Sequence, residues 1–271
     1  MAAVPLLHHI EPGTQASLAD LDPADTSAAP GPKAITAPAT EALADRLAEL
    51  QDLLWARNQE KVLVILQGID TAGKGGTVEH VFGAVNPAGL RVVSFKAPSE
   101  AELARDYLWR IHAQVPVSGE IAVFDRSHYE DVLAVRVEEL VPEERWRRRF
   151  DHINAFEQLL VDEGTTVVKL FLHISKEEQR ARLQARLDQP EKRWKYRASD
   201  LDARRRWDDY QAAFEEAISR TSTDHAPWYV IPADKKWYRN WAVASIMVST
   251  LEGLDMTWPE PVEDLSGVVV E

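Results

Sequence analysis

Five short apolar runs alternate with longer segments of helical periodicity along this chain. The runs are Lys61–Gln67, Leu90–Phe95, Glu120–Phe124, Thr166–Ile174 and Trp228–Ile231. The helical segments lie near residues 74–85, 100–114, 142–162, 175–188, 200–220 and 236–252. Nearly continuous apolar strands separated by helices predict an α/β fold of three layers, α/β/α, with helices on both faces of a parallel sheet. Ligands of such sheets bind beyond the carboxyl ends of the strands.

Both ends of the chain depart from this alternation. Residues 1–39 are rich in Pro, Ala, Asp, Ser and Thr and have no apolar period, so we expect a disordered or loosely attached arm. From Thr40 onward leucine recurs every three or four residues, as in a helix. We therefore expect one domain over residues 40–258, followed by a tail at 259–271.

The first apolar run leads into the most informative segment, Gly68-Ile69-Asp70-Thr71-Ala72-Gly73-Lys74. Its spacing is G-x-x-x-x-G-K and a helical segment follows, which is typical of a phosphate-binding loop. Such a loop points backbone N–H groups at one place, at the positive end of a helix dipole, and Lys74 adds a mobile charge. The candidate phosphate-binding residues of the loop and its helix are Gly73, Gly75, Gly76 and Thr77. The alternative is a glycine turn that binds nothing.

Two details of this loop differ from the usual pattern. Gly75 stands where a Ser or Thr normally holds Mg²⁺. Asp70 places a carboxylate in a loop built for anions, which is unfavourable unless a cation or a proton lies between them. We therefore interpret Asp70 as an indirect sign of Mg²⁺.

A second motif follows the run that ends at Phe124. Asp125 and Arg126 come directly after it and, in a parallel sheet, emerge at the same edge as the glycine loop. A strand that ends in Asp is typical of the second metal-orienting carboxylate of a P-loop enzyme, and the Arg fork suits two-point contact with phosphate. The alternative is that Asp125 caps the next helix and pairs with Arg126. Tyr129 and Glu130 are further candidates for substrate binding.

The helical segment 175–188 carries Arg182 and Arg186 on one face. It stops near Pro190, and a basic, aromatic segment follows. This arrangement resembles the lid of a phosphotransferase, over about 175–200, whose arginines stabilise charge on the transferring phosphoryl group. Arg186 is the better catalytic candidate because it lies nearer the hinge expected at Pro190. Surface pairing with acidic neighbours on the same helix is the alternative.

Two further cations are candidates for substrate contact. Lys96 ends the second strand and should reach the same sheet edge. Arg136 follows Glu130 by one or two helical turns and can face the same groove.

Composition limits the class of protein. The chain has 271 residues, 45% of them hydrophobic, and no cysteine, which fits a reducing cytoplasm. It has no run of the roughly 20 apolar residues that a membrane span needs, and no signal-peptide pattern, so we expect a cytoplasmic protein without a membrane partner. A net charge of −13 disfavours nucleic acid as a partner. The local basic clusters still allow one polyanion-binding groove.

At this point the motifs resemble those of a known family. The glycine loop, Ser94–Pro98, Asp125–Val132, the arginine-bearing helix and Ala226–Asn240 occur in the order seen in the polyphosphate kinase 2 family, over about residues 40–258. The resemblance implies a thymidylate-kinase-like P-loop fold with a helical lid. It implies Mg²⁺-dependent phosphoryl transfer, with Mn²⁺ as a substitute, between inorganic polyphosphate and nucleoside mono- and diphosphates. AMP and ADP are the first candidates and guanine nucleotides are further ones. We also expect a homo-oligomer, either a dimer or a tetramer.

The resemblance also implies roles for single residues. Asp70 and Asp125 would hold Mg²⁺ and orient the accepting phosphate, while Lys74 and Arg126 would grip the transferred one. Arg182 and Arg186 would belong to the lid. Relatives that accept nucleoside monophosphates look most like this chain in Gln67–Asp70 and Trp109–His112, and some of them have Asn where this chain has Asp125.

Three other functions share part of this pattern. An ATP-dependent nucleoside or nucleotide kinase would share loop, lid and fold, but Gly75 and Asp70 argue against it. A non-catalytic nucleotide-binding switch does not need paired lid arginines, and the chain has no Asn-Lys-x-Asp guanine motif. A dinucleotide-dependent oxidoreductase needs G-x-G-x-x-G, and Val78 occupies the position of the later glycine.

Overall fold

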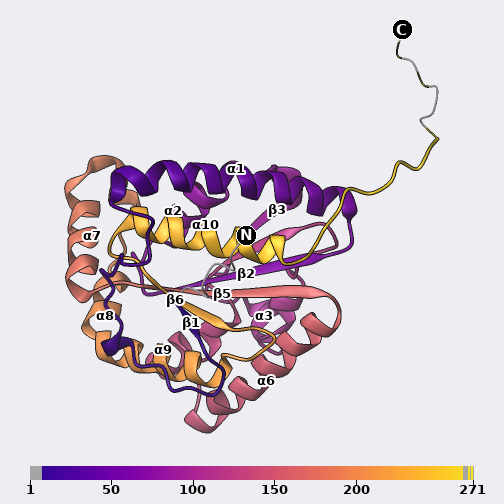
Figure 1. Cartoon of the computed structure of the whole chain (residues 1–271). Coiled ribbons are helices and arrows are strands. Elements are labelled where there is room, and N and C mark those ends of the chain that lie inside the picture. Colours follow the sequence, from indigo (N-terminus) through magenta and orange to yellow (C-terminus); the bar gives the residue numbers. More distant parts are fainter. Residues whose placement is uncertain (1–7, 265–267, 269, 271) are drawn as a thin grey trace.

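A six-stranded sheet forms the centre of the computed structural model, which describes residues 8–264, 268 and 270 (Figure 1). The five strands predicted from the apolar runs pair in parallel, and their ends lie within one residue of the prediction. Their bounds are β2 (Lys61–Gln67), β3 (Leu90–Ser94), β4 (Ile121–Asp125), β5 (Thr165–His173) and β6 (Trp228–Pro232). With β1 (His9–Ile10) at one edge, the strand order is β1-β6-β5-β2-β4-β3, which places β2 and its glycine loop between β5 and β4.

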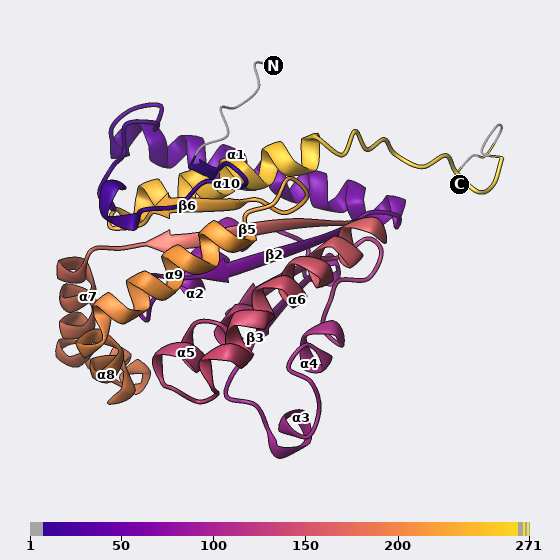
Figure 2. The same cartoon turned by 90° about the horizontal axis from the view of Figure 1, so that it is seen from below.

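Helices cover both faces of this sheet, as predicted (Figures 1 and 2). α1 (Lys33–Arg57), α2 (Lys74–Val81) and α10 (Lys236–Glu252) lie on one face, and α6 (Glu143–Asp162) and α9 (Trp207–Thr221) on the other. The remaining helices are α3 (Glu100–Leu103), α4 (Trp109–His112), α5 (Ala134–Val137), α7 (Lys176–Asp188) and α8 (Ser199–Arg205). The three-layer α/β/α fold is therefore confirmed. Among the described helices, none has the length and apolar content of a membrane span.

Two predicted helices are interrupted. The segment 100–114 forms α3 and α4, and between them the Asp106 side chain accepts a hydrogen bond from the Leu108 N–H at 3.0 Å, which makes a turn. The segment 200–220 forms α8 and α9, separated at Arg206, whose backbone leaves the helical region. The Arg206 guanidinium donates to the carbonyl of Val137, which ties the break to α5.

The prediction of a loosely attached arm is wrong for residues 8–39. β1 (His9–Ile10) pairs antiparallel with β6, and Leu18 is only 2% exposed. The carbonyl of Pro23 accepts a hydrogen bond from the Asp234 N–H at 3.0 Å, and α1 begins at Lys33, well before Thr40. Composition misled because a short strand pairing, one buried leucine and backbone hydrogen bonds to distant residues hold this segment, and these contacts need few apolar side chains. Residues 1–7 lie outside the described residues, as do 265–267, 269 and 271 of the predicted tail.

Candidate active site

The glycine loop connects β2 to α2 at the carboxyl edge of the sheet. Gly73 caps α2 with φ 109° and ψ 21°, a conformation that L side chains rarely adopt. Lys74, the first residue of α2, is 8% exposed, and its Nζ donates to the Gly68 carbonyl at 2.8 Å. A helix N-terminus, a turn of glycine backbone and a lysine thus meet in the geometry that binds phosphate.

Asp70 and Arg126 bring the first two motifs into contact. β4 lies beside β2, with Leu66 level with Asp125, so that Arg126 emerges opposite the loop. Asp70 Oδ1 and Arg126 Nη2 are 2.5 Å apart, and Arg126 Nη1 lies 3.7 Å from Glu130 Oε2. Arg126 has a positive φ of 66°, which is uncommon for a residue other than glycine and is found at functional sites.

The charges of these groups set their protonation. Burial acts to raise the pKa of the Asp70 carboxyl, but the positive charges of Arg126 and Lys74 outweigh it and lower the pKa. Asp70 is therefore an anion, as a metal ligand must be. The pKa of Glu130 is raised, because its burial outweighs the same two cations. The pKa values of the two carboxyl groups that flank Arg126 are thus shifted in opposite directions. Such shifts are common at sites that transfer protons or bind metals.

Asp70 and Asp125 are chemically suited to Mg²⁺. Both supply hard oxygen ligands, and Mg²⁺ is usually held by one or two carboxylates together with substrate phosphates and water. Within the described ranges, no group of three or more His, Asp or Glu side chains converges on one point. The residues present therefore fit a metal that arrives with phosphate better than a metal held by protein alone. The alternative for Asp125 is wrong: Ser127, not Asp125, caps the next turn, and Arg126 pairs with Asp70.

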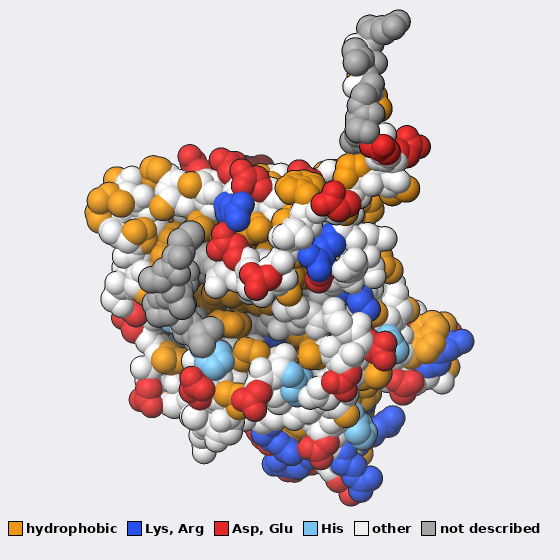
Figure 3. Space-filling model, turned by 45° about the vertical axis from the view of Figure 1, so that its right-hand side comes forward, with side chains coloured by type: hydrophobic (Ala, Val, Ile, Leu, Met, Phe, Trp, Pro, Cys, Tyr) orange, Lys and Arg blue, Asp and Glu red, His pale blue; other side chains and the backbone are white. Residues whose placement is uncertain are grey.

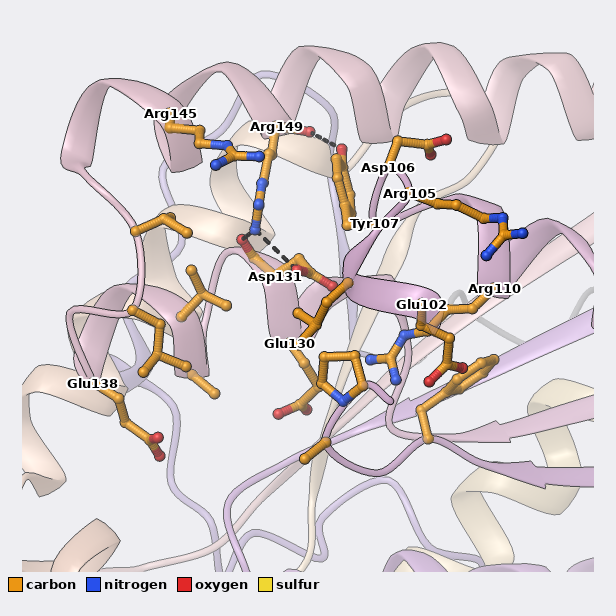
Figure 4. A pocket seen from close by; sticks show the side chains of 18 of the residues that line it. Glu102, Arg105, Asp106, Tyr107, Arg110, Glu130, Asp131, Glu138, Arg145 and Arg149 are labelled. Carbon is orange, nitrogen blue, oxygen red and sulfur yellow. Dashed lines mark hydrogen bonds and ion pairs between the residues drawn. The ribbon is translucent and has the colours of Figure 1, made fainter. Parts of the chain in front are cut away.

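A cavity of about 820 Å³ opens beside this pair, and both Arg126 and Glu130 line it. Figure 4 shows part of this lining, with Glu130 labelled. That volume lies in the usual range for small-molecule sites. One wall is built by Arg149, whose Nη1 donates to the Asp131 carboxylate at 2.9 Å and whose guanidinium lies 4.5 Å from the centre of the Tyr107 ring. Apolar side chains from several elements complete the lining, namely Phe95, Leu103, Leu140 and Val141.

Several cations face the same cavity. Lys96 lines it, as predicted for a residue at this sheet edge, and its carbonyl accepts from Arg110 Nη1 at 2.8 Å. Arg105, Arg145 and Arg148 also line it. Basic side chains gather mostly in the lower half of the face in Figure 3, and acidic ones are spread over the whole face. Seven Lys and Arg side chains line the cavity together with six Asp and Glu side chains, so positive charge is in slight excess there although the net charge of the protein is −13.

Comparison with known proteins agrees with this geometry. The family model for polyphosphate kinase 2 matches residues 33–258. This chain belongs to the polyphosphate kinase 2 family. It is 57% identical over 264 residues to an AMP/ADP-polyphosphate phosphotransferase of Meiothermus ruber, covering 97% of this chain and 99% of that protein. It is 46% identical over 228 residues to an ADP-polyphosphate phosphotransferase of Rhodopseudomonas palustris, covering 80% of this chain and 79% of that protein.

A solved structure is similar over nearly the whole chain. The crystal structure of polyphosphate kinase 2 from Arthrobacter aurescens TC1 superimposes with a TM-score of 0.92 at 46% identity, covering 96% of this chain and 92% of that one. The P-loop α/β fold of this polyphosphate kinase 2 family member is thereby confirmed, and with it the class of enzyme.

The two lid arginines of this family member have different surroundings. Arg182, on α7, donates to four carbonyls, at distances from 2.6 to 3.2 Å, and pairs with Glu178 at 2.7 Å. The four carbonyls belong to Thr71, Ala72, Ala233 and Asp234. Because the N–H groups of Arg182 donate to these backbone carbonyls, this side chain stabilises the glycine loop. We therefore no longer count Arg182 among the substrate-binding candidates.

Arg186, the second lid arginine, acts electrostatically on the Asp70 carboxylate. It pairs with Asp200 at 3.1 Å and its charge is one of those that lower the pKa of Asp70. The predicted lid is built from α7, the short turn η4 (Pro190–Lys195) and the start of α8. Arg186 therefore stays our candidate for a cation acting on the transferred phosphate.

Three predicted substrate contacts point elsewhere. Tyr129 is 0% exposed and its hydroxyl lies in the core, 2.8 Å from Glu157 Oε1. Thr77 is also fully buried, and its hydroxyl donates to the Gly73 carbonyl within α2 at 3.2 Å. Arg136 pairs with Glu216 of α9 at 2.7 Å and lies over the Trp146 ring. Tyr129 and Thr77 are enclosed within the protein, so the predictions of direct substrate contact are wrong for these two, whereas for the partly exposed Arg136 that contact stays a prediction.

Sequence reasoning also missed residues of the site. Arg149 and Asp131 shape the cavity, and Arg239 of α10 lies against the glycine loop. A signal for Arg239 was present in the sequence: it is the one charged residue between Lys236 and Glu252, in a helical segment rich in apolar residues. A lone charge in such a segment is buried, and a buried charge needs an explanation.

Proposed function

We propose that this chain transfers phosphoryl groups between inorganic polyphosphate and adenine nucleotides, that it accepts AMP as well as ADP, and that it needs Mg²⁺. The observation that carries the proposal is the Asp70–Arg126 pair, which stands where the glycine loop meets the cavity of about 820 Å³. The relative that is 57% identical over nearly the whole chain is named for both AMP and ADP.

The two substrates are assigned to the two sides of this pair. Polyphosphate lies on the glycine loop, where backbone N–H groups and Lys74 bind one of its phosphates. The nucleotide lies in the cavity, with its base among the apolar side chains and its phosphate towards Arg126. Lys96, Arg110 and Arg126 provide positive charge there. This arrangement brings two polyanions together, and the cations reduce their repulsion and hold the accepting oxygen in line.

Asp70 and Asp125 would hold the metal, and Mg²⁺ would supply neutralisation of the charge that develops on the phosphoryl oxygens. Asp70 also orients Arg126 through their ion pair and holds this guanidinium beside the glycine loop, where it can meet the phosphates. Arg186 approaches from the lid and adds positive charge to the transferred group. Lid closure excludes the water that would otherwise hydrolyse the donor.

Transfer assays with purified protein test this proposal. Polyphosphate is the only phosphoryl donor, and AMP, ADP and GDP are offered singly, each with Mg²⁺ or with EDTA. We expect ADP from AMP and ATP from ADP, both abolished by EDTA and restored by Mg²⁺ or Mn²⁺. Transfer from ATP but not from polyphosphate would instead identify an ordinary nucleotide kinase. Activity with ADP alone would remove the assignment of AMP as an acceptor.

A further inference from the structure

Arg239, near the N-terminus of α10, lies directly against the glycine loop. The residue is 2% exposed. A Cβ added at Gly73 would overlap Arg239 Nη1, and one added at Gly76 would lie 3.3 Å from Nη2. The absence of side chains at these two positions therefore makes room for a guanidinium as well as for the backbone turn.

This buried guanidinium has no acidic partner among the described residues. Its Nε and Nη2 both donate to the side-chain oxygen of Asn240, a neutral amide, at 3.1 and 2.7 Å. Its charged neighbour is another cation, Arg182, whose Nη1 would lie 3.6 Å from the same Cβ at Gly73. Burial and then the charge of Arg182 lower the pKa of Arg239 to about 10. It therefore remains charged at neutral pH.

Other cations extend this cluster along the start of α10. Burial and the charges of Arg182, Arg239 and Lys192 lower the pKa of Lys236. The nearby carboxylates are already engaged. Glu178 pairs with Arg182 at 2.7 Å, and Asp234 accepts hydrogen bonds from the backbone and hydroxyl of Ser175.

A buried charge that lacks a counter-charge destabilises the folded protein. A protein keeps such a charge when an anion arrives to pair with it, and the anion expected here is the donor that the loop binds. Arg239 and Lys236 lie on the α10 side of the loop, whereas the nucleotide cavity lies on the Arg126 side. The cluster is therefore placed to meet phosphates of the donor chain and not those of the acceptor.

We propose that Arg239 is a polyphosphate-binding residue, which with Lys236 forms an anion subsite beside the glycine loop for donor phosphates that precede the transferred one. This inference rests on the proposed function, because it assumes that the loop binds the donor. The competing role is a structural one, in which Arg239 only keeps the loop in shape.

Arg239→Met separates these roles, because methionine keeps much of the apolar stem and removes the charge. Thermal melting is measured without ligand, with long-chain polyphosphate, and with inorganic phosphate. An unpaired buried charge is destabilising, so the ligand-free variant should melt at the wild-type temperature or above it. The shift produced by polyphosphate should fall to less than about half, and the KM for polyphosphate should rise about 10- to 100-fold, the effect of losing a charged hydrogen bond. The KM for AMP should change less than about twofold, because weaker binding of the polyphosphate donor leaves the binding of the nucleotide acceptor unchanged.

Arg91→Met is the matched control. Arg91 is a partly buried arginine at the opposite end of the sheet, and its Nε is paired with Glu120 at 2.8 Å. Removing it leaves a carboxylate without its partner, so the ligand-free melting temperature should fall, while the polyphosphate shift stays at the wild-type value. Arg239→Met should thus reduce the polyphosphate shift without lowering the ligand-free melting temperature, whereas Arg91→Met should lower that temperature without reducing the shift.

A lower ligand-free melting temperature for Arg239→Met, with wild-type polyphosphate shift and KM, would make Arg239 a structural clamp and overturn the proposal. If Arg239→Met does not fold, Arg239→Gln is measured in the same way, and wild-type polyphosphate affinity in that variant has the same consequence. If inorganic phosphate alone produces the full Arg239-dependent shift, the subsite binds single phosphates and not the donor chain, which also overturns it. Should the wild type bind polyphosphate through Arg239 and yet transfer nothing, the subsite stands and the proposed function fails.

Discussion

Replacing Lys169 with Met should destabilise the protein strongly, because it would break a fully buried ion pair behind the active site. Lys169, in the middle of β5, and Glu157 of α6 are both 0% exposed. Lys169 Nζ lies 2.6 Å from Glu157 Oε2, 3.1 Å from the Tyr129 hydroxyl and 2.5 Å from the Thr221 carbonyl. Burial acts to raise the pKa of Glu157, but Lys169 and then His128 outweigh it and lower that pKa, so Glu157 is an anion.

The size of the effect follows from what remains after the substitution. Lys169→Met would leave Glu157 buried with two partners, His128 at 3.2 Å and the Tyr129 hydroxyl at 2.8 Å, and with no full counter-charge near its second oxygen. Removing one member of a buried ion pair costs about 3–5 kcal/mol. Turnover should fall too, because Tyr129 belongs to the turn that places Arg126 and Glu130.

Urea unfolding at neutral pH measures this cost. Lys61→Met is the control, since the Lys61 ammonium lies at the exposed start of β2, and it should change the unfolding free energy by less than about 0.5 kcal/mol. The double variant Lys169→Met/Glu157→Leu should recover most of the loss, because apolar replacements of a buried pair are often neutral or better. A loss below about 1 kcal/mol for Lys169→Met alone would refute the reasoning.

Further predictions concern the loop and the lid. Asp70→Asn should lower turnover at least about 10²-fold with the fold intact, the effect of losing one well-placed electrostatic group, and normal activity would count against a role in metal binding. Because pairing lowers the pKa of Asp70, its contribution to stability is present above the usual carboxyl range and is lost as pH falls through the folded-state pKa, so Asp70→Asn should flatten the acid side of the melting-temperature profile. Arg186→Ala should slow single-turnover transfer about 10²-fold at saturating substrates, and Arg186→Lys should restore only part of it; a wild-type rate in Arg186→Ala would make α7 a surface feature. Gly73→Ala should lower the melting temperature because of its positive φ and the contact with Arg239, whereas Gly75→Ala, whose Cβ would meet nothing within 4 Å, should not; equal melting of the two would contradict the account of the loop.

Much of the architecture follows from local sequence patterns. The strands were predictable because each is an apolar run of a few residues bounded by polar ones. The glycine loop was predictable because the spacing of its glycines and lysine specifies the conformation of the loop. The proximity of Asp70 and Arg126 followed from the rule that parallel strands end at one edge of the sheet. In these cases the sequence neighbours of a residue decide where its side chain lies.

The errors occurred where a distant segment decides. Tyr129 follows the site motif directly, yet a buried Lys169 draws its hydroxyl inward. Arg182 lies on the same helix face as Arg186, but carbonyls from two other segments take its donors. Residues 8–39 look like linker by composition, and distant segments hold them in place: His9 and Ile10 pair with β6, Leu18 is buried, and the Pro23 carbonyl accepts from the Asp234 N–H. Arg239 was missed because its importance rests on what it does not contact, a carboxylate.

The most direct test of the account follows one phosphoryl group from donor to acceptor. ³²P-labelled polyphosphate is mixed with excess enzyme, Mg²⁺ and either AMP or ADP, in the absence of any added nucleoside triphosphate, and the products are separated over a single turnover. The account predicts label in ADP when AMP is the acceptor and in ATP when ADP is the acceptor, and no transfer by a Lys74→Ala variant. Label that appears only as inorganic phosphate, or equal transfer by Lys74→Ala, would contradict the assignment of polyphosphate to the glycine loop.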